Sequence, residues 1–432
     1  MRRSTVRLAA LSVSSLLILA GCGDDDSGGS GGGGLSGTYK IGVFGPAQIP
    51  QGADIRDGAQ LAADELNAAG TGAGKRRIEI VFCDSENGAK PEKAVACATK
   101  FAQEDRVDAM LGGFSSGETL AMLDTAVRAQ VPFVATGAAS PDVTKDVTAD
   151  GPRKYIFRIG PINSTFLAAD MCVTIVTKLA PATGYTKFGI LFEDVEFARP
   201  LTAFLQACLV NPKAASKGAI PVDKGVTLVG TEKHLPDATD FSSQFRTLSN
   251  KGAQFVLEIN SRQEGVTLVK QWGTLKPKFA LGGINVASQQ NVFFDATGGA
   301  AKFELNGPAG IVRAPISPKT IPFFDAFKAK YARDPIYNGA SSYDGVHALA
   351  EAVAKANSAK PDDVVTALAT MDRVGAQGVE RFSANHDIIY GAGDATKGIN
   401  PVYFQWLPSG DRKIVFPESL AEGNKYIKPD WL

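Results

Sequence analysis

Two loops of small residues hold the side chains best suited to gripping a ligand. The first, residues 112–117, follows a short apolar run and contains Ser115 and Ser116, and the second, residues 136–140, follows the next apolar run. In a parallel sheet both loops emerge at the carboxyl ends of adjacent strands, where open α/β sheets bind ligands. A helix that begins at the serines also offers unpaired N–H groups to an anion. The pattern therefore predicts a carboxylate-binding site.

The same residues also fit a role that needs no ligand. Ser115 followed by Glu118 has the S-x-x-E spacing of a capping box, in which the serine side chain accepts a hydrogen bond from the first helical turn. The two interpretations are compatible, since one serine can cap the helix while the other faces outward.

A third hypothesis is hydrolysis. Residues 113–117, GFSSG, match the G-x-S-x-G nucleophile elbow of serine hydrolases in a strand–turn–helix context. A triad needs a histidine later in the chain, and the candidates are His234, His347 and His386. No HGGG-type oxyanion segment is present in the sequence. We expect that the protein is not an enzyme.

The amino terminus has the pattern of a targeting segment. The first seven residues contain three arginines. Residues 8–20 follow as an apolar run that is too short to span a bilayer as a fixed helix. The run ends in Leu-Ala-Gly-Cys at Cys22, which resembles the lipobox of bacterial lipoproteins and implies acylation of Cys22. We therefore predict a signal peptide over residues 1–21 and a lipidated, flexible tether over residues 22–37. The protein would be extracytoplasmic and anchored to the bacterial cell membrane.

Four further cysteines then lie in an oxidising compartment, where disulfides form. We favour local pairing, Cys83 with Cys97 and Cys172 with Cys208, among the three possible connectivities. The second pair requires that the two helices carrying it lie on the same face of a sheet. No Cys/His cluster has metal-ligand spacing, so we predict no metal and no cofactor.

From Tyr39 onward, apolar runs of strand length alternate with amphipathic segments of helical length, and a second series of the same kind begins near Tyr155. This alternation predicts an α/β protein with two similar parallel-sheet lobes. Helical patterns over residues 321–371 are expected to cover the first lobe, and residues 402–416 carry a hairpin signal.

Three short crossings between the lobes would form a hinge, and we place them near residues 159–161, 283–285 and 395–400. The first lobe is then predicted to comprise residues 38–158 plus 285–397, and the second residues 159–284 plus 398–432.

These elements occur in a familiar order. The matching segments are IGVFGP, QGADIRDGAQLAADELNAAG, VFCDSENGAKPEKAVACATK, VDAMLGGFSSGETLAML, VPFVATGAASP, YIFRIGP, ASSYDGVHALAEAV and the final hairpin. The chain resembles the type 1 periplasmic binding proteins, in particular the leucine/isoleucine/valine-binding branch that serves ABC importers. The resemblance covers almost the whole chain after the tether. It implies a ligand held in the cleft between the lobes, mostly by the first lobe.

The resemblance also implies site residues. Ser115 and Ser116 match the serines that hold the substrate carboxylate in the family. The other candidate contacts are Gln51, Gly137, Ala138, Ala139, Ser140, Phe197, Asn260, Arg262 and Asn285. Core packing is an equal alternative for Phe197, and an exposed loop position is the alternative for Arg262.

Two family positions depart from the pattern. Amino-acid binders of this branch hold the α-ammonium with a threonine, here Ala139, and with an acidic residue, here Ile284. Ser140 or Glu264 could substitute, but neither stands at a matching position. A buried ammonium without a counter-charge is costly. We therefore predict an amino-acid-like, carboxylate or amide ligand for which an α-ammonium is not required.

The predicted partners are this small molecule and an ABC permease in the membrane, with the protein itself a monomer. Charge is balanced, with 45 basic and 45 acidic residues, so we predict no nucleic-acid partner. A sensor of the same fold that takes no part in transport is the alternative function.

Overall fold

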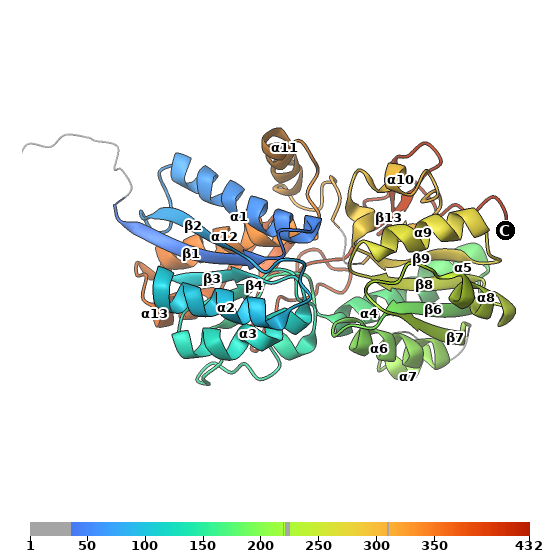
Figure 1. Cartoon of the computed structure of the whole chain (residues 1–432), viewed down its shortest axis with the longest axis horizontal. Coiled ribbons are helices and arrows are strands. Elements are labelled where there is room, and N and C mark those ends of the chain that lie inside the picture. The colour runs from blue at the N-terminus through green and yellow to red at the C-terminus, as the bar shows by residue number, and fades with distance from the viewer. Residues whose placement is uncertain (1–35, 219, 221–224, 309–310) are drawn as a thin grey trace, which may run out of the picture. The chain divides into compact units, whose positions relative to one another are not determined.

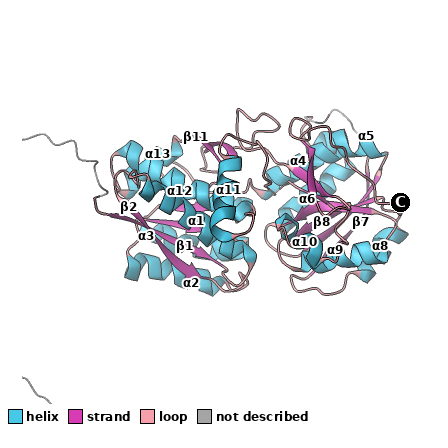
Figure 2. Cartoon of the chain, turned by 90° about the horizontal axis from the view of Figure 1, so that it is seen from above, coloured by secondary structure: helices cyan, strands magenta, loops and turns pink. Residues whose placement is uncertain are grey.

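The computed structural model of the chain describes residues 36–218, 220, 225–308 and 311–432. The predicted signal peptide, the lipidation site Cys22 and tether residues 23–35 lie outside the described residues. The strands form two large sheets, and each lies between helices (Figures 1 and 2). We call the elements around these sheets the first and second lobes. The predicted α/β class with parallel sheets is confirmed.

The strands are β1 (Thr38–Gly45), β2 (Arg77–Asp84), β3 (Ala109–Gly112), β4 (Phe133–Ala135), β5 (Ile156–Arg158), β6 (Lys187–Glu193), β7 (Thr227–His234), β8 (Phe255–Asn260), β9 (Ala280–Asn285), β10 (Leu305–Asn306), β11 (Asp372–Gly375), β12 (Gly378–Arg381), β13 (Tyr403–Trp406) and β14 (Arg412–Phe416).

The helices are α1 (Pro50–Ala68), α2 (Pro91–Lys100), α3 (Ser116–Ala129), α4 (Ser164–Thr174), α5 (Ala180–Thr183), α6 (Ala198–Val210), α7 (Pro212–Ala215), α8 (Ser242–Asn250), α9 (Glu264–Leu275), α10 (Phe293–Ala296), α11 (Thr320–Tyr331), α12 (Tyr337–Ala356) and α13 (Pro361–Ala369).

The first sheet is parallel and has the strand order β2-β1-β3-β4-β5. Its inner strands β3 and β4 are apolar and fully buried, as expected for strands covered by helices on both faces. Ile41 and Val43 of β1 pack in the core that includes residues of α1 and α12. Phe44 faces the opposite side, in the core that includes residues of α2 and α3. Figure 1 shows these two helical layers on either side of the strands.

The second sheet has the order β14-β13-β10-β9-β8-β6-β7. Strands β6 to β10 run parallel, and the predicted late hairpin adds β13 and β14 in antiparallel orientation. Ile190 of β6 packs in the core that contains α4 and α6 residues, whereas its neighbour Leu191 packs in the core that contains α8 and α9 residues. Strand alternation thus builds a helical layer on each face.

The prediction that the chain returns to the first lobe at residues 283–285 is wrong. After β9 the chain forms β10, which pairs in parallel with β9 and antiparallel with β13. Residues 286–306 therefore remain with the second sheet, and the return follows Asn306. A strand of two residues leaves no periodic signal in the sequence, which is why it was missed.

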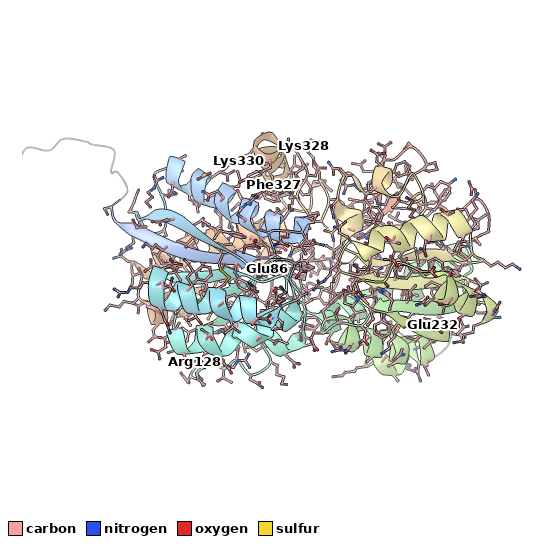
Figure 3. The ribbon with its side chains drawn as sticks, viewed as in Figure 1. Glu86, Arg128, Glu232, Phe327, Lys328 and Lys330 are labelled. Carbon is pink, nitrogen blue, oxygen red and sulfur yellow. A yellow bond between two sulfur atoms is a disulfide. The ribbon has the colours of Figure 1, made fainter. Side chains whose placement is uncertain are left out.

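Beyond this return, α11 and α12 pack on α1 and α13 packs on α12, so that all three cover the first lobe as their apolar patterns predict. Lys330 of α11, labelled in Figure 3, pairs with Asp64 of α1. The Tyr331 hydroxyl also donates to the backbone carbonyl of Asp57, at 2.9 Å. These contacts hold α11 against the helix whose first turn borders the cleft.

Both predicted disulfides are confirmed. Cys83–Cys97 joins β2 to α2 with a Cα separation of 5.7 Å, and Cys172–Cys208 joins α4 to α6 at 6.1 Å. The second bond forms because α4 and α6 lie on the same face of the second sheet, which is the condition that the pairing required.

Candidate functional site

A cavity of about 300 Å³, here called the cleft cavity, lies between loops of the two lobes. First-lobe residues around it include Gly88, Phe114, Ser115, Ser116, Glu118, Gly137, Ala139 and Tyr337. Second-lobe residues include Leu167, Val195, Phe197, Ser261, Arg262, Ile284 and Val286. Of the eleven predicted contact residues, the structure therefore brings six to the cavity: Ser115, Ser116, Gly137, Ala139, Phe197 and Arg262.

The first binding loop turns sharply between β3 and α3. Gly113 has φ +86°, and a Cβ there would lie 2.4 Å from Thr119 Oγ1, so the turn requires glycine. Ser115 is the N-cap residue of α3, but its side chain accepts no capping bond, so the predicted capping box is wrong. The Ser115 hydroxyl is therefore available to the cavity, beside the first N–H groups of the helix.

The second binding loop packs directly on the first. A Cβ on Gly137 would lie 2.5 Å from the carbonyl oxygen of Gly113. Ser116 Oγ accepts a hydrogen bond from the Ser140 N–H at 3.1 Å. Its own hydroxyl proton remains for a ligand oxygen. Ala138 and Ser140, both predicted contacts, do not line the cavity, and Ser140 instead supplies this internal bond.

Arg158 binds backbone carbonyl groups of the second binding loop, a role that was not predicted from the sequence. Its guanidinium is fully buried and donates to the carbonyl oxygens of Ala138 at 3.2 Å and Ser140 at 2.7 Å. It also forms two bonds to the Asp387 carboxylate, at 2.8 and 2.5 Å. A charged residue within the apolar strand YIFRIG was the available signal.

The opposite wall of the cavity combines an apolar part with the paired charges of Asp194, Glu196 and Arg199. Ile284 and Val286 line it at the end of β9, and Phe197 lines it at the start of α6. Tyr337, also not predicted, closes one side and donates its hydroxyl to the Gly137 carbonyl oxygen at 3.2 Å. The wall around Ile284 thus offers hydrocarbon at the position where the family pattern has an acidic residue.

Two side chains join the lobes beside the cavity. Arg262 donates to the carbonyl oxygens of Asn87 at 3.2 Å and Gly88 at 2.8 Å, in the loop that contains Glu86 (Figure 3). The Arg262 side chain is 18% exposed, so it is not a solvated loop charge. Gln51 does not line the cavity, because its amide donates across the cleft to the Ser261 carbonyl oxygen at 2.8 Å.

Asn260 and Asn285, both predicted contacts, point away from the cavity. Their amides donate to Glu258 Oε2 at 2.7 and 3.0 Å. Asn260 and Asn285 are register partners on β8 and β9, and Glu258 lies two residues before Asn260, on the same face of the strand. The three side chains therefore form a buried polar cluster below the site.

Two carboxyl groups near the cavity have perturbed acidities. Burial raises the pKa of Glu118 to about 7, against the lowering effects of a bond from Ser85 and of the Arg262 charge. Burial and the charge of Glu193 raise the pKa of Glu264 to about 8. Glu118 lines the cavity, whereas the proposed substitutes Ser140 and Glu264 do not.

The histidines required by the hydrolase hypothesis lie elsewhere. His234 Nε2 is 2.9 Å from Asn260 Oδ1, and the His386 ring stacks on Phe157 with a centroid separation of 4.0 Å. His347 packs on Tyr343 of α12. None of the three is among the described residues that line the cleft cavity with Ser115.

Comparisons with known proteins find relatives over almost the whole described chain. A family model described as periplasmic binding protein matches residues 38–405. The chain is 26% identical over 380 residues to Leu/Ile/Val-binding protein homolog 8 of Brucella abortus, covering 86% of this chain and 87% of that protein.

Solved structures are similar over the same region. A branched-chain amino acid transporter substrate binding protein from Streptococcus pneumoniae, in complex with isoleucine, has a TM-score of 0.68 at 23% identity. The match covers 88% of this chain and all of that one. A solute binding protein from R. palustris, in complex with benzoate, has a TM-score of 0.71 at 18% identity and covers 89% of this chain and 99% of that one.

Proposed function

Because the chain belongs to the periplasmic binding protein family, we propose that it is an extracytoplasmic solute-binding protein of an ABC importer and that its ligand is a small carboxylate or amide. The ligand lies in the cleft cavity and is delivered to a membrane permease when the lobes open.

One observation carries this proposal. The Ser115 hydroxyl, the Ser116 hydroxyl and the amino terminus of α3 converge on a cavity that both lobes enclose. Hydroxyl and backbone N–H donors at a helix amino terminus suit an anionic or amide oxygen. The volume of about 300 Å³ suits a molecule with the size of an amino acid or an aromatic acid.

The ligands of the similar structures support the same chemistry. Isoleucine and benzoate, bound in the proteins from S. pneumoniae and R. palustris, share a carboxylate and differ in whether they carry an ammonium group. Here the wall formed by Ile284 and Val286 offers no charge to an ammonium, and the carboxylates of Asp194 and Glu196 at the cavity are already paired with Arg199. Ser115 and Ser116, by contrast, both line the cavity. The preferred ligand is therefore a carboxylate whose remaining part is apolar.

A thermal-shift screen of amino acids, aliphatic and aromatic carboxylates, amides, and alcohols and amines that lack both groups tests the proposal. A ligand present at 100 times its dissociation constant stabilises the folded state by about 2.7 kcal/mol, which is a clear rise in melting temperature. We expect carboxylates to stabilise the protein. Stabilisation only by compounds that lack both a carboxylate and an amide would contradict the assignment.

We also expect lipidation at Cys22, which would hold the binding protein beside its permease. The Leu-Ala-Gly-Cys sequence and the Gly/Ser-rich tether motivate this prediction. Two or more acyl chains give stable anchoring, whereas one gives only reversible binding. Mass spectrometry of the mature amino terminus should find a diacylglyceryl cysteine at residue 22, and a free amino terminus at another residue would exclude it.

A further inference from the structure

A second and larger cavity, of about 740 Å³, lies beside α4. We call it the α4 cavity. It is bordered by α4, by the segment between β12 and β13, and by residues after β14. It shares no lining residue with the cleft cavity, and its volume lies within the usual range of small-molecule sites.

The walls of the α4 cavity are rich in aromatic side chains, contributed by Phe166, Phe204, Tyr390, Tyr403 and Phe416. Phe166 is 38% exposed, and its ring centroid lies 5.7 Å from that of Tyr390. The helical stretch Ser164–Thr183 that begins with α4 is strongly apolar, yet only half of its most apolar window is buried. An apolar surface therefore remains open to this cavity.

One carboxylate stands among these rings. Asp170 accepts hydrogen bonds from the Tyr390 hydroxyl at 2.6 Å and the Tyr403 hydroxyl at 2.7 Å. Lys178 also lines the cavity, but its ammonium group pairs with Glu418 at 2.6 Å rather than with Asp170. Among the residues that the structure describes, no basic side chain forms an ion pair with Asp170, and burial raises the pKa of its carboxyl group.

Both oxygens of the Asp170 carboxylate have a tyrosine donor, and each can accept a further hydrogen bond. A carboxylate can accept about four hydrogen bonds, and the two tyrosines supply one to each oxygen. Asp170 is half-buried, and Lys178 lowers the pKa of its carboxyl group without forming an ion pair with it. A cation that reaches the cavity would therefore gain a direct, charge-assisted contact with this carboxylate. Aromatic faces attract cations as well, most strongly when the pair is desolvated.

We propose that the α4 cavity is a second binding site, which takes an organic ammonium ion with an apolar body. The ammonium group lies against Asp170, and the apolar body lies on the rings of Phe166 and Tyr390. The site is independent of the carboxylate bound in the cleft cavity, because the two cavities have different linings. Its ligand chemistry is also the opposite one, cationic rather than anionic.

Calorimetric titration with benzylammonium tests the proposal, and benzyl alcohol serves as the neutral control. We expect saturable binding of the cation and at least tenfold weaker binding of the alcohol. Asp170→Asn removes the charge but keeps an acceptor for a tyrosine. It should weaken binding of the cation by about tenfold or more. Asp363→Asn removes an equal charge from an exposed position on α13 and should leave the affinity unchanged.

Two further variants keep the outcome decisive. Phe166→Ala removes a partly exposed ring, so the fold should survive while cation binding weakens several-fold. Ser116→Ala, in the cleft cavity, should leave cation binding unchanged. Equal affinity for the cation and the alcohol, no effect of Asp170→Asn in a folded protein, or loss of cation binding in Ser116→Ala would each overturn the proposal.

Discussion

Replacing Asp387 with alanine should lower the free energy of unfolding by about 3–5 kcal/mol, the usual cost of leaving one partner of a buried ion pair without the other. Arg158 is fully buried, and Asp387 is its only carboxylate partner among the described residues. The guanidinium also holds the carbonyl oxygens of Ala138 and Ser140, so its displacement should loosen the second binding loop.

Urea unfolding at neutral pH measures this effect, with both disulfides intact. Asp387→Asn keeps one acceptor oxygen and should lose less stability than the alanine variant. Asp124→Ala, at an exposed position on α3 with no bonding partner in the described structure, should change the unfolding free energy by about 0.5 kcal/mol or less. Equal losses in Asp387→Ala and Asp124→Ala would show that the buried pair does not support the loop.

Replacing Ser116 with alanine should weaken ligand binding by roughly 10- to 150-fold, which corresponds to the loss of one hydrogen bond to a charged group, about 1.5–3 kcal/mol. The same change removes the acceptor of the Ser140 N–H, so a small loss of stability should accompany it. Ser115→Ala should weaken binding without that loss, because the Ser115 side chain has no capping bond.

Ser243→Ala, at an exposed position on α8, is the control for the serine variants and should change neither quantity. Thermal-shift titration of the four proteins with one carboxylate separates binding from stability. Unchanged affinity in both Ser115→Ala and Ser116→Ala would show that these serines do not bind the carboxylate. Covalent labelling of Ser115 by a serine-reactive probe, with turnover of an ester, would instead support the hydrolase hypothesis.

The features of the fold that depend on residues close together in the sequence were predicted correctly. Strand and helix periods identified the two sheets, and the short spacing of Cys83 and Cys97 identified their bond. The return after β10 was not predictable, because Leu305 and Asn306 join the sheet only through pairing with residues far along the chain.

The site divides in the same way. Ser115 and Ser116 were identified because a turn and a helix start place them, which is local information. Arg158 and Tyr337 were missed because their roles depend on partners more than a hundred residues away, Asp387 and Gly137.

The position of Asn260 could have been predicted more closely. In FVLEIN the side-chain period of two puts Asn260 on the same face as Glu258, and a buried glutamate needs hydrogen-bond donors. Burial raises the pKa of Glu258 well above its usual range, and the neighbouring Glu304 adds to the rise. The amides of Asn260 and Asn285 serve this group rather than a ligand.

The most direct test of the account is a calorimetric comparison of leucine and valine with their deaminated acids and with benzoate. The cavity offers two serine hydroxyls and a helix amino terminus to a carboxylate, and it offers Ile284 where the family pattern has an acid. We therefore expect an ammonium-free acid to bind at least as tightly as the corresponding amino acid. Micromolar binding of leucine or valine, with no binding of any ammonium-free acid, would contradict it.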